Sequence, residues 1–220
     1  LYGVDAMQQP KPQMAAGHTV SEDGLEWRIT LRDGLKFHDG EPVRAQDCAA
    51  SLARWAQRDP FGQALGAAVE SWSAADDKTI SIKLTRPFAP LLHAIGKPHS
   101  RPAMMMPERL ASIDAKTQIT EMVGSGPYRF KADEYVSGDR VVYEKFADYI
   151  PRSEKADWTT GGKVAHFDRL EWQIIPDAAT AVAAIQSGDV DWLGSVLTDL
   201  QPVLEAHPDA AKVVDTEKKL

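Results

Sequence analysis

The stretch LEWRITLRDGLKFHDGEPV, residues 25–43, decides the fold because it holds the clearest strand and the clearest turns of the chain. Its first half alternates apolar and polar side chains with a period of two, which is typical of a strand with one buried face. Asp-Gly pairs follow at 33–34 and 39–40, and glycine allows the positive φ that tight turns require. The sequence therefore predicts a strand over 25–31 and a second short extended piece over 35–38, together forming a small hairpin unit.

Working outward, the hydrophobic pattern predicts further elements on both sides of this stretch. Residues 1–20 contain two Pro and indicate a short strand or turn that leads into an extended connection. Apolar side chains recur at helical spacing from Cys48 to Ala56 and predict a helix over 45–57. The other elements expected are strands near 80–84, 128–130, 140–144 and 170–174, helices over 90–95 and 108–111, and loops over 96–107 and 148–162.

The last part of the pattern indicates a strand, a helix and another strand. Asp177 offers an N-cap carboxylate to a helix over 178–187, and Gly188 ends that helix. We expect 190–193 to be a buried strand, which makes a parallel βαβ crossover the economical interpretation. The expected fold class is α/β of mixed α+β character.

Composition excludes several classes of protein. The chain has 220 residues, of which 43% are hydrophobic and 26% charged, and these fractions match an ordinary globular protein. Its formal net charge is −7, and its Lys and Arg residues are scattered, so nucleic acid is not an expected partner. No apolar stretch approaches the roughly 18 residues that a membrane span needs. The single Cys48 cannot form an internal disulfide.

Two acidic residues and the histidines are the candidates for acid, base or metal chemistry. Asp189 and Asp191 could do acid and base work if burial separated their pKa values, but carboxylates just after a glycine turn are more often solvated. The six His residues show no H-E-x-x-H pattern, and His38 beside Asp39 fits a turn residue better than a ligand. We therefore expect no metal, no cofactor and no catalytic residues.

Two other motifs favour structural roles over catalytic ones. Gly124-Ser125-Gly126 lacks the third glycine of a dinucleotide-binding loop, and Ser125 lacks the preceding glycine of a nucleophile elbow, so the motif predicts a tight turn into a strand. Met104, Met105 and Met106 could line an adaptable pocket, although filling a gap in the core is the more common use of methionine.

Residues 27–43, with Ala45 and Asp47, resemble the signature of the family 5 extracellular solute-binding proteins, which are peptide-, dipeptide- and nickel-binding receptors of ABC importers. Two more segments match in the right order: 124–128 is similar to a G-T-G-P-Y turn, and 175–191 is similar to an I-P-D, T and G-x-x-D pattern. One departure is Arg44, which stands where the family usually has a capping Thr and should cost about 1 kcal/mol. Asp47 can still favour the helix N-terminus.

The resemblance implies a type II periplasmic-binding-protein fold, with the first lobe and the extra domain of this family present and the second lobe absent. Members of the family are about twice as long, so we expect a fragment. Residues 1–13 and 120–194 would then form the core sheet of the ligand-binding lobe, 14–119 the extra α+β domain, and 195–220 the start of the hinge.

The family layout also implies a set of cleft-facing loop residues. An apolar ring, hydrogen-bonding side chains and an arginine that could pair with a peptide carboxylate would make half of a pocket. We expect two walls with one methionine nearby, and the residues concerned are Phe61, Gly62, Gln63, His99, Ser100, Arg101 and Met104.

The leading functional hypothesis is a non-catalytic receptor that is periplasmic or lipid-anchored. In such a receptor two lobes close on the ligand about a hinge, and the receptor delivers a peptide or similar solute to an ABC permease. The expected protein is a monomer without a cofactor. Two alternatives stay open: a hydrolase that uses Asp189 and Asp191 or an unseen Ser-His pair, and a sensor module built on a binding-protein fold.

Overall fold

The computed structural model describes residues 1–206 of the chain. His207 and the last part of the predicted hinge segment 195–220 lie outside the described residues. The chain forms two compact units, the first made of 1–131 and 143–170 and the second of 132–142 and the residues from Glu171 onward. The predicted mixed α/β fold is confirmed, and the units are described separately below.

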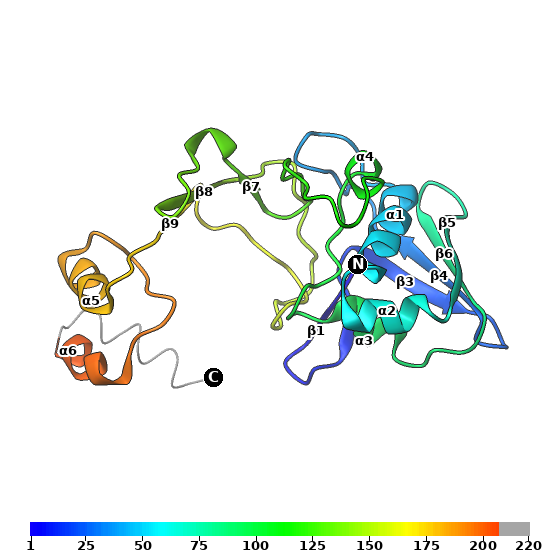
Figure 1. The fold of residues 1–220 in the computed structure, drawn as a ribbon, viewed down its shortest axis with the longest axis horizontal. Helices are drawn as coiled ribbons and strands as arrows, with labels where there is room; N and C mark the ends of the chain where they lie inside the picture. Colours follow the sequence, from blue (N-terminus) through cyan, green and yellow to red (C-terminus); the bar gives the residue numbers. More distant parts are fainter. Residues whose placement is uncertain (207–220) are drawn as a thin grey trace. The chain divides into compact units, whose positions relative to one another are not determined.

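A four-stranded antiparallel sheet is the centre of the first unit (Figure 1). Its order is β3 (Ala15–Val20), β4 (Glu26–Leu31), β6 (Thr79–Leu84) and β5 (Val69–Ala74). Ile29 lies opposite Ile80 in the register, and both side chains are fully buried. The strands predicted near 25–31 and 80–84 are therefore confirmed, and they are neighbours.

Helix α1 (Ala45–Ala56) packs against β5 and β6. Its buried stripe includes Cys48, Leu52 and Trp55, as the helical spacing predicts. At its N-terminus Arg44 makes no side-chain cap, while the Asp47 carboxylate accepts the Arg44 backbone N–H at 2.8 Å. Of the two hydrogen bonds of a capping box, only the one from the Arg44 N–H to the Asp47 side chain is therefore present. The other, which a threonine side chain at position 44 would accept, is missing as the sequence predicts.

The predicted hairpin between 25–31 and 35–38 is wrong. Both edges of β4 are already occupied, by β3 on one side and β6 on the other. Residues 35–38 instead close a small loop, in which Lys36 forms an isolated bridge with Pro42 and the Phe37 N–H donates to the Glu41 carbonyl at 2.8 Å. Because the Phe37 side chain is 1% exposed, the loop is held by burial in the core rather than by pairing with β4.

A short hairpin and three short helices complete this part of the first unit. The hairpin joins β1 (Tyr2–Val4) to β2 (Pro10–Pro12), and α3 (Leu91–Gly96) packs against it. The other helices are α2 (Pro60–Gly66) and α4 (Glu108–Ala111). The helices predicted over 90–95 and 108–111 are confirmed, and α2 was not predicted.

Strand β1 is also tied to a distant loop. The Val4 N–H donates to the Thr159 hydroxyl at 2.8 Å, and that hydroxyl donates to the Val4 carbonyl at 3.0 Å. A Cβ atom on Gly3 would lie 2.6 Å from the Thr159 carbonyl oxygen, so only glycine allows this close approach.

A second sheet has the order β7 (Tyr128–Phe130), β8 (Arg140–Lys145), β9 (Arg169–Gln173), with β7 and β8 antiparallel. All three strands occur where the alternation predicts them. A 3-10 turn, η1 (Ala132–Glu134), lies between the first two.

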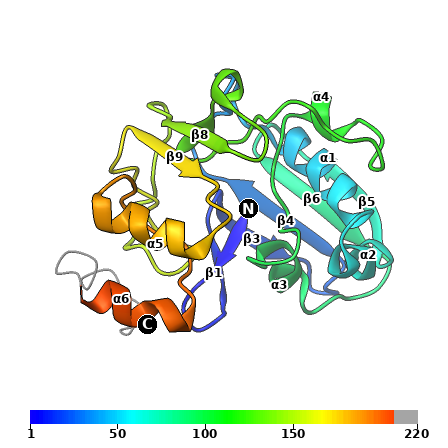
Figure 2. The ribbon, with the colours of Figure 1, turned by 60° about the vertical axis from the view of Figure 1, so that its left-hand side comes forward.

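In the second unit, α5 (Ala178–Ser187) lies beside α6 (Gln201–Glu205), which follows the 3-10 turn η2 (Thr198–Leu200) (Figure 2). Val182 and Leu204 form the small buried cluster between these helices. The predicted caps of α5 are confirmed: the Asp177 carboxylate accepts the Thr180 N–H at 2.7 Å, and Gly188 has φ of 78°.

The predicted buried strand over 190–193, and with it the parallel βαβ crossover, is wrong. Residues 174–206 contain no strand. The Asp189 and Val190 N–H groups turn back to the Ala184 carbonyl, which closes the C-terminal end of α5. Trp192 is 64% exposed and its ring lies 6.2 Å from that of Trp172 in β9, while Leu193 packs against the cluster of Val182 and Leu204.

Candidate ligand-binding site

A cavity of about 670 Å³ lies within the first unit. Its walls come from β1, from the segment that follows α3, from residues 119–128, and from the loops on either side of Thr159. Ligand pockets for small molecules commonly enclose about 300–1,000 Å³. The cavity is therefore large enough for a solute the size of a short peptide.

Methionines make up a large part of the wall of this cavity. Five of the chain's six methionines line it: Met14, Met104, Met105, Met106 and Met122. Met105 also belongs to the buried core, whereas Met104 is 66% exposed, so the run 104–106 both fills the core and lines a pocket. Because thioether side chains are flexible and polarizable, this methionine wall can adapt to differently shaped apolar groups.

The cavity also has a polar corner made of Gln13, Arg32, Tyr149 and Lys163. Arg32 donates to the Gln13 carbonyl at 3.2 Å and to the Ile150 carbonyl at 2.6 Å, and its guanidinium lies 6.0 Å from the centre of the Tyr149 ring. Gln13 Nε2 donates to the Gly161 carbonyl at 3.1 Å, which joins Gln13 to the loop that carries Lys163. Lys163 is exposed, and desolvation of its ammonium group by the surrounding loops lowers its pKa, whereas burial raises the pKa of Tyr149.

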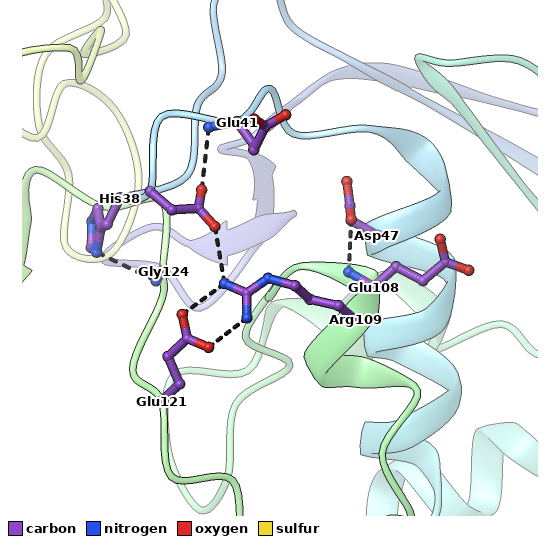
Figure 3. Close-up of polar contacts among 8 residues, drawn as sticks. His38, Glu41, Asp47, Glu108, Arg109, Glu121 and Gly124 are labelled. Carbon is purple, nitrogen blue, oxygen red and sulfur yellow. Dashed lines mark hydrogen bonds and ion pairs between the residues drawn. The ribbon is translucent and has the colours of Figure 1, made fainter.

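His38 joins the two sequence motifs beside this cavity (Figure 3). Its Nδ1 accepts the Gly124 N–H at 3.3 Å, and its Nε2 lies 3.1 Å from the Gly126 carbonyl, so the neutral ring with hydrogen on Nε2 satisfies both contacts. Burial lowers the pKa of His38 and favours that neutral form. His38 is thus more than the turn residue that the sequence suggested, because it holds the glycine turn in place.

Three charged residues extend this junction (Figure 3). The Arg109 guanidinium forms a bidentate pair with the Glu121 carboxylate and also donates to Asp39 at 3.1 Å. Asp47 Oδ1 accepts the Glu108 N–H at 2.7 Å and fixes the start of α4, which carries Arg109. Arg109 therefore connects α4 to the turn at Asp39 and to the cavity residue Glu121 through charge-assisted hydrogen bonds.

The first predicted wall, Phe61, Gly62 and Gln63, lies in α2 and not in a loop. Asp59 is the reason, because its carboxylate accepts the Phe61 and Gly62 N–H groups, both at 2.9 Å, and caps the helix. Phe61 packs beside Phe88, Gly62 is buried, and Gln63 is exposed.

The second predicted wall is a loop, and the structure brings it next to the first. Lys97 donates to Asp59 at 2.5 Å and to the Ser100 carbonyl at 2.6 Å, and Arg101 donates to the Arg58 carbonyl at 2.8 Å. Ser100 and Arg101 both have positive φ, a strained conformation for residues other than glycine.

Of the seven residues predicted to face a ligand, Met104 lines the cavity, while the other six lie outside its walls. The ring of His99 contacts that of Trp158 at 6.2 Å. The sequence analysis did not single out Asp59, Lys97, Gln13 or Lys163. The Asp59-Pro60 pair was the available signal, since an N-cap acid before proline marks a helix start.

The residues considered for catalysis belong to different units: Asp189 and Asp191 to the second, and Ser125 to the first. Asp189 is exposed and accepts the Ser187 hydroxyl at 2.7 Å, and Asp191 is exposed. Ser125 lines the cavity, and its hydroxyl contacts the Met14 sulfur at 3.9 Å. Within residues 1–206, no three His, Cys, Asp or Glu side chains are grouped as they would be around a metal ion.

The first unit thus encloses a solute-sized cavity with a methionine wall and a polar corner, and His38 joins two sequence motifs beside it. Comparison with known proteins shows the class of protein. Residues 9–218 match the model of bacterial extracellular solute-binding proteins, family 5, middle region. The chain belongs to this family.

Similar proteins include curated relatives and solved structures. A probable peptide ABC transporter periplasmic-binding protein of Sinorhizobium fredii is 38% identical over 213 residues, which are 95% of this chain and 39% of that protein. A glutathione-binding protein of Salmonella typhi is 30% identical over 194 residues, 87% of this chain and 35% of that protein. The structure of PBP AgaA from A. tumefaciens R10 in complex with agropinic acid has a TM-score of 0.73 and 25% identity, covering 94% of this chain and 40% of that one.

The chain thus spans well under half the length of these relatives. In residues 1–206, no helix combines the length and the apolar character that a bilayer crossing requires.

Proposed function

We propose that this chain is part of the solute-binding component of an ABC importer and captures peptides or similar small solutes. The observation that carries the proposal is a cavity of about 670 Å³ with a methionine wall and a polar corner, in a member of family 5. An adaptable apolar wall suits solutes whose side chains vary, and fixed polar groups suit a constant backbone. The relative named as a peptide-transport binding protein supports the same assignment.

The complete protein acts without catalysis, in the periplasm or anchored by lipid outside the cell, as a monomer that docks on permease subunits. Two lobes close around the solute, and the solute shifts the equilibrium toward the closed form only by its differential affinity for that form. In this scheme 1–13 and 120–194 form the ligand-binding lobe, 14–119 the extra domain and 195–220 the start of the hinge. The Asp59–Lys97 pair would then hold the two predicted walls together.

The test is calorimetry of the complete protein against panels of free-acid peptides, sugars, amino acids and metal chelates. We expect micromolar or tighter binding of one or more peptides and no binding of the sugars. The isolated 220 residues, measured in parallel, should bind weakly because the closure step is missing. A complete, folded protein that binds no member of any panel would remove the transport role.

A further inference from the structure

The methionines of the cavity differ in how far water reaches them. Met104 is 66% exposed and Met122 is 67% exposed, although both line the cavity. Met105 is 6% exposed and belongs to the core, and Met14 and Met106 are half-buried. A small oxidant dissolved in water therefore reaches the side chains of two cavity methionines, whereas the core shields that of Met105.

Hydrogen bonding separates the same two residues from Met14. The Ser125 hydroxyl lies 3.9 Å from the Met14 sulfur and can donate to it weakly. Within residues 1–206, the sulfurs of Met104 and Met122 accept no such bond. Because an oxidant attacks a lone pair of the sulfur, the free lone pairs of Met104 and Met122 leave these two side chains the more reactive.

The backbone on either side of the two exposed methionines is held in place. Met104 lies between two residues of the buried core. Met122 lies between Glu121, which is ion-paired, and Val123, which packs against the core. The two side chains are therefore fixed at the wall of the cavity while they remain open to water.

Oxidation of these side chains changes the chemical character of the wall. The sulfur lone pair forms a bond to one peroxide oxygen, the O–O bond breaks, and water leaves, so the sulfur loses the two electrons that the peroxide gains. The product, methionine sulfoxide, is polar, and reductases that use thiols reverse the reaction. An apolar group placed against a sulfoxide leaves the S–O group without a hydrogen-bond partner, which is unfavourable.

We propose that Met104 and Met122 form a reversible oxidation site through which peroxide lowers the affinity of the cavity for apolar solutes. In the reduced form the thioethers contact apolar side chains of the solute, and in the oxidised form the sulfoxides disfavour them. This inference rests on the proposed function, because it concerns the regulation of the same cavity. Met7 is an internal control, since it is 78% exposed and lies outside the cavity walls.

The first measurement follows oxidation of the solute-free complete protein by hydrogen peroxide. Tandem mass spectrometry of the digested protein measures the gain of one oxygen atom at each methionine over time. We expect Met104 and Met122 to be oxidised at rates similar to that of Met7 and before Met105, because reactivity follows exposure. Oxidation of Met105 as fast as that of Met104 would overturn the site.

Calorimetry then compares the treated and untreated complete protein, with Ala-Leu-Ala, Ala-Ser-Ala and the tightest peptide of the earlier panel. We expect oxidation to weaken the binding of Ala-Leu-Ala roughly 5- to 100-fold, as for the burial of an unpaired polar group, and that of Ala-Ser-Ala less. Treatment with methionine sulfoxide reductases A and B and a thiol should restore the original affinity.

Variants assign the effect to the two residues. The double substitution Met104→Leu and Met122→Leu keeps apolar side chains of similar volume but removes both sulfurs, so its affinity should be the same before and after peroxide. The matched control is Met7→Leu, which removes an exposed sulfur outside the cavity and should lose affinity on oxidation as the unmodified protein does. Thermal unfolding checks that each variant is folded.

The outcomes separate this inference from the proposed function. Unchanged affinity of the unmodified protein after Met104 and Met122 have been oxidised would overturn the oxidation site and leave peptide binding intact, whether or not the variants fold. A peroxide effect of the same size in the double variant would overturn it too, because the effect would come from other residues. If no peptide binds the untreated complete protein, the proposed function fails and this inference fails with it.

Discussion

Asp59 is a residue whose importance lies in what it positions. Its side chain is fully buried, it caps α2, and it pairs with Lys97, which in turn holds the Ser100 carbonyl. Burial alone would raise the pKa of Asp59, but the hydrogen bonds from Lys97 and from the Gly62 and Phe61 N–H groups outweigh it, and the pKa lies below its ordinary value. One carboxylate thus joins two segments almost forty residues apart.

Replacing Asp59 should be costly. We expect Asp59→Ala to lower the free energy of unfolding by about 3–5 kcal/mol, because Lys97 is left without its partner. The measurement is urea unfolding followed by circular dichroism. Asp191→Ala removes a carboxylate from an exposed position and should change the same quantity by less than about 0.5 kcal/mol. Equal effects of the two substitutions would contradict the role assigned to Asp59.

The same pair predicts how stability depends on pH. The pKa of Asp59 is depressed in the folded chain, so its contribution is present above the unfolded value of about 3.9 and is lost as the pH falls through the folded value. The difference in unfolding free energy between the unmodified chain and Asp59→Ala should therefore shrink on acidification below about pH 4. Urea titrations at a series of pH values measure it; a difference that grows on acidification would reverse the sign of this argument.

At the scale of elements, α5 shows how well caps specify a helix. Asp177 accepts both the N–H and the hydroxyl of Thr180, at 2.7 and 2.6 Å. We expect Asp177→Ala to destabilise the first turn by about 1 kcal/mol, measured as faster amide hydrogen exchange over 178–181. Asp177→Ser, which keeps an acceptor at the cap, should restore most of the protection. Unchanged exchange in Asp177→Ala would show that packing alone holds the helix.

The elements that could be predicted from the sequence are those with a local signal. Strand β4, helix α1 and helix α5 have clean periodicity or caps, and each occurs within a residue or so of its expected bounds. Strand β3 was not predicted because AAGHTV has no alternation, and it pairs only because β4 offers a free edge. The apolar run over 190–193 failed as a strand because the N–H groups at its start close the end of α5 on the Ala184 carbonyl.

The candidate site was predicted less well than the helices and strands, because its residues lie far apart in the sequence. The polar corner brings Gln13 and Arg32 together with Tyr149 and Lys163, and no local pattern connects residues more than a hundred positions apart. The run Met104 to Met106 was visible, but its companions Met14 and Met122 join it only in the folded chain. The family resemblance supplied the type of protein, and the structure supplied the cavity.

At the scale of the whole molecule, Cys48 reports on the integrity of the core. Its side chain is fully buried among α1 and the central sheet, and burial raises the pKa of its thiol to about 12. The thiol should therefore resist alkylation by iodoacetamide near neutral pH and react only when the core opens. Mass spectrometry of the labelled Cys48 peptide, with and without urea, measures this. Rapid labelling in native buffer would contradict the described core.

The contact between β1 and Thr159 has a consequence for biosynthesis. A nascent chain exposes Gly3 and Val4 long before residue 159 has been made, and until then the Val4 N–H and carbonyl lack the hydroxyl that satisfies them. A partly synthesised chain therefore has a free strand edge at β1, which other extended chains can pair with. Chaperones that hold the newly made polypeptide would shield this edge until the loop around Thr159 arrives.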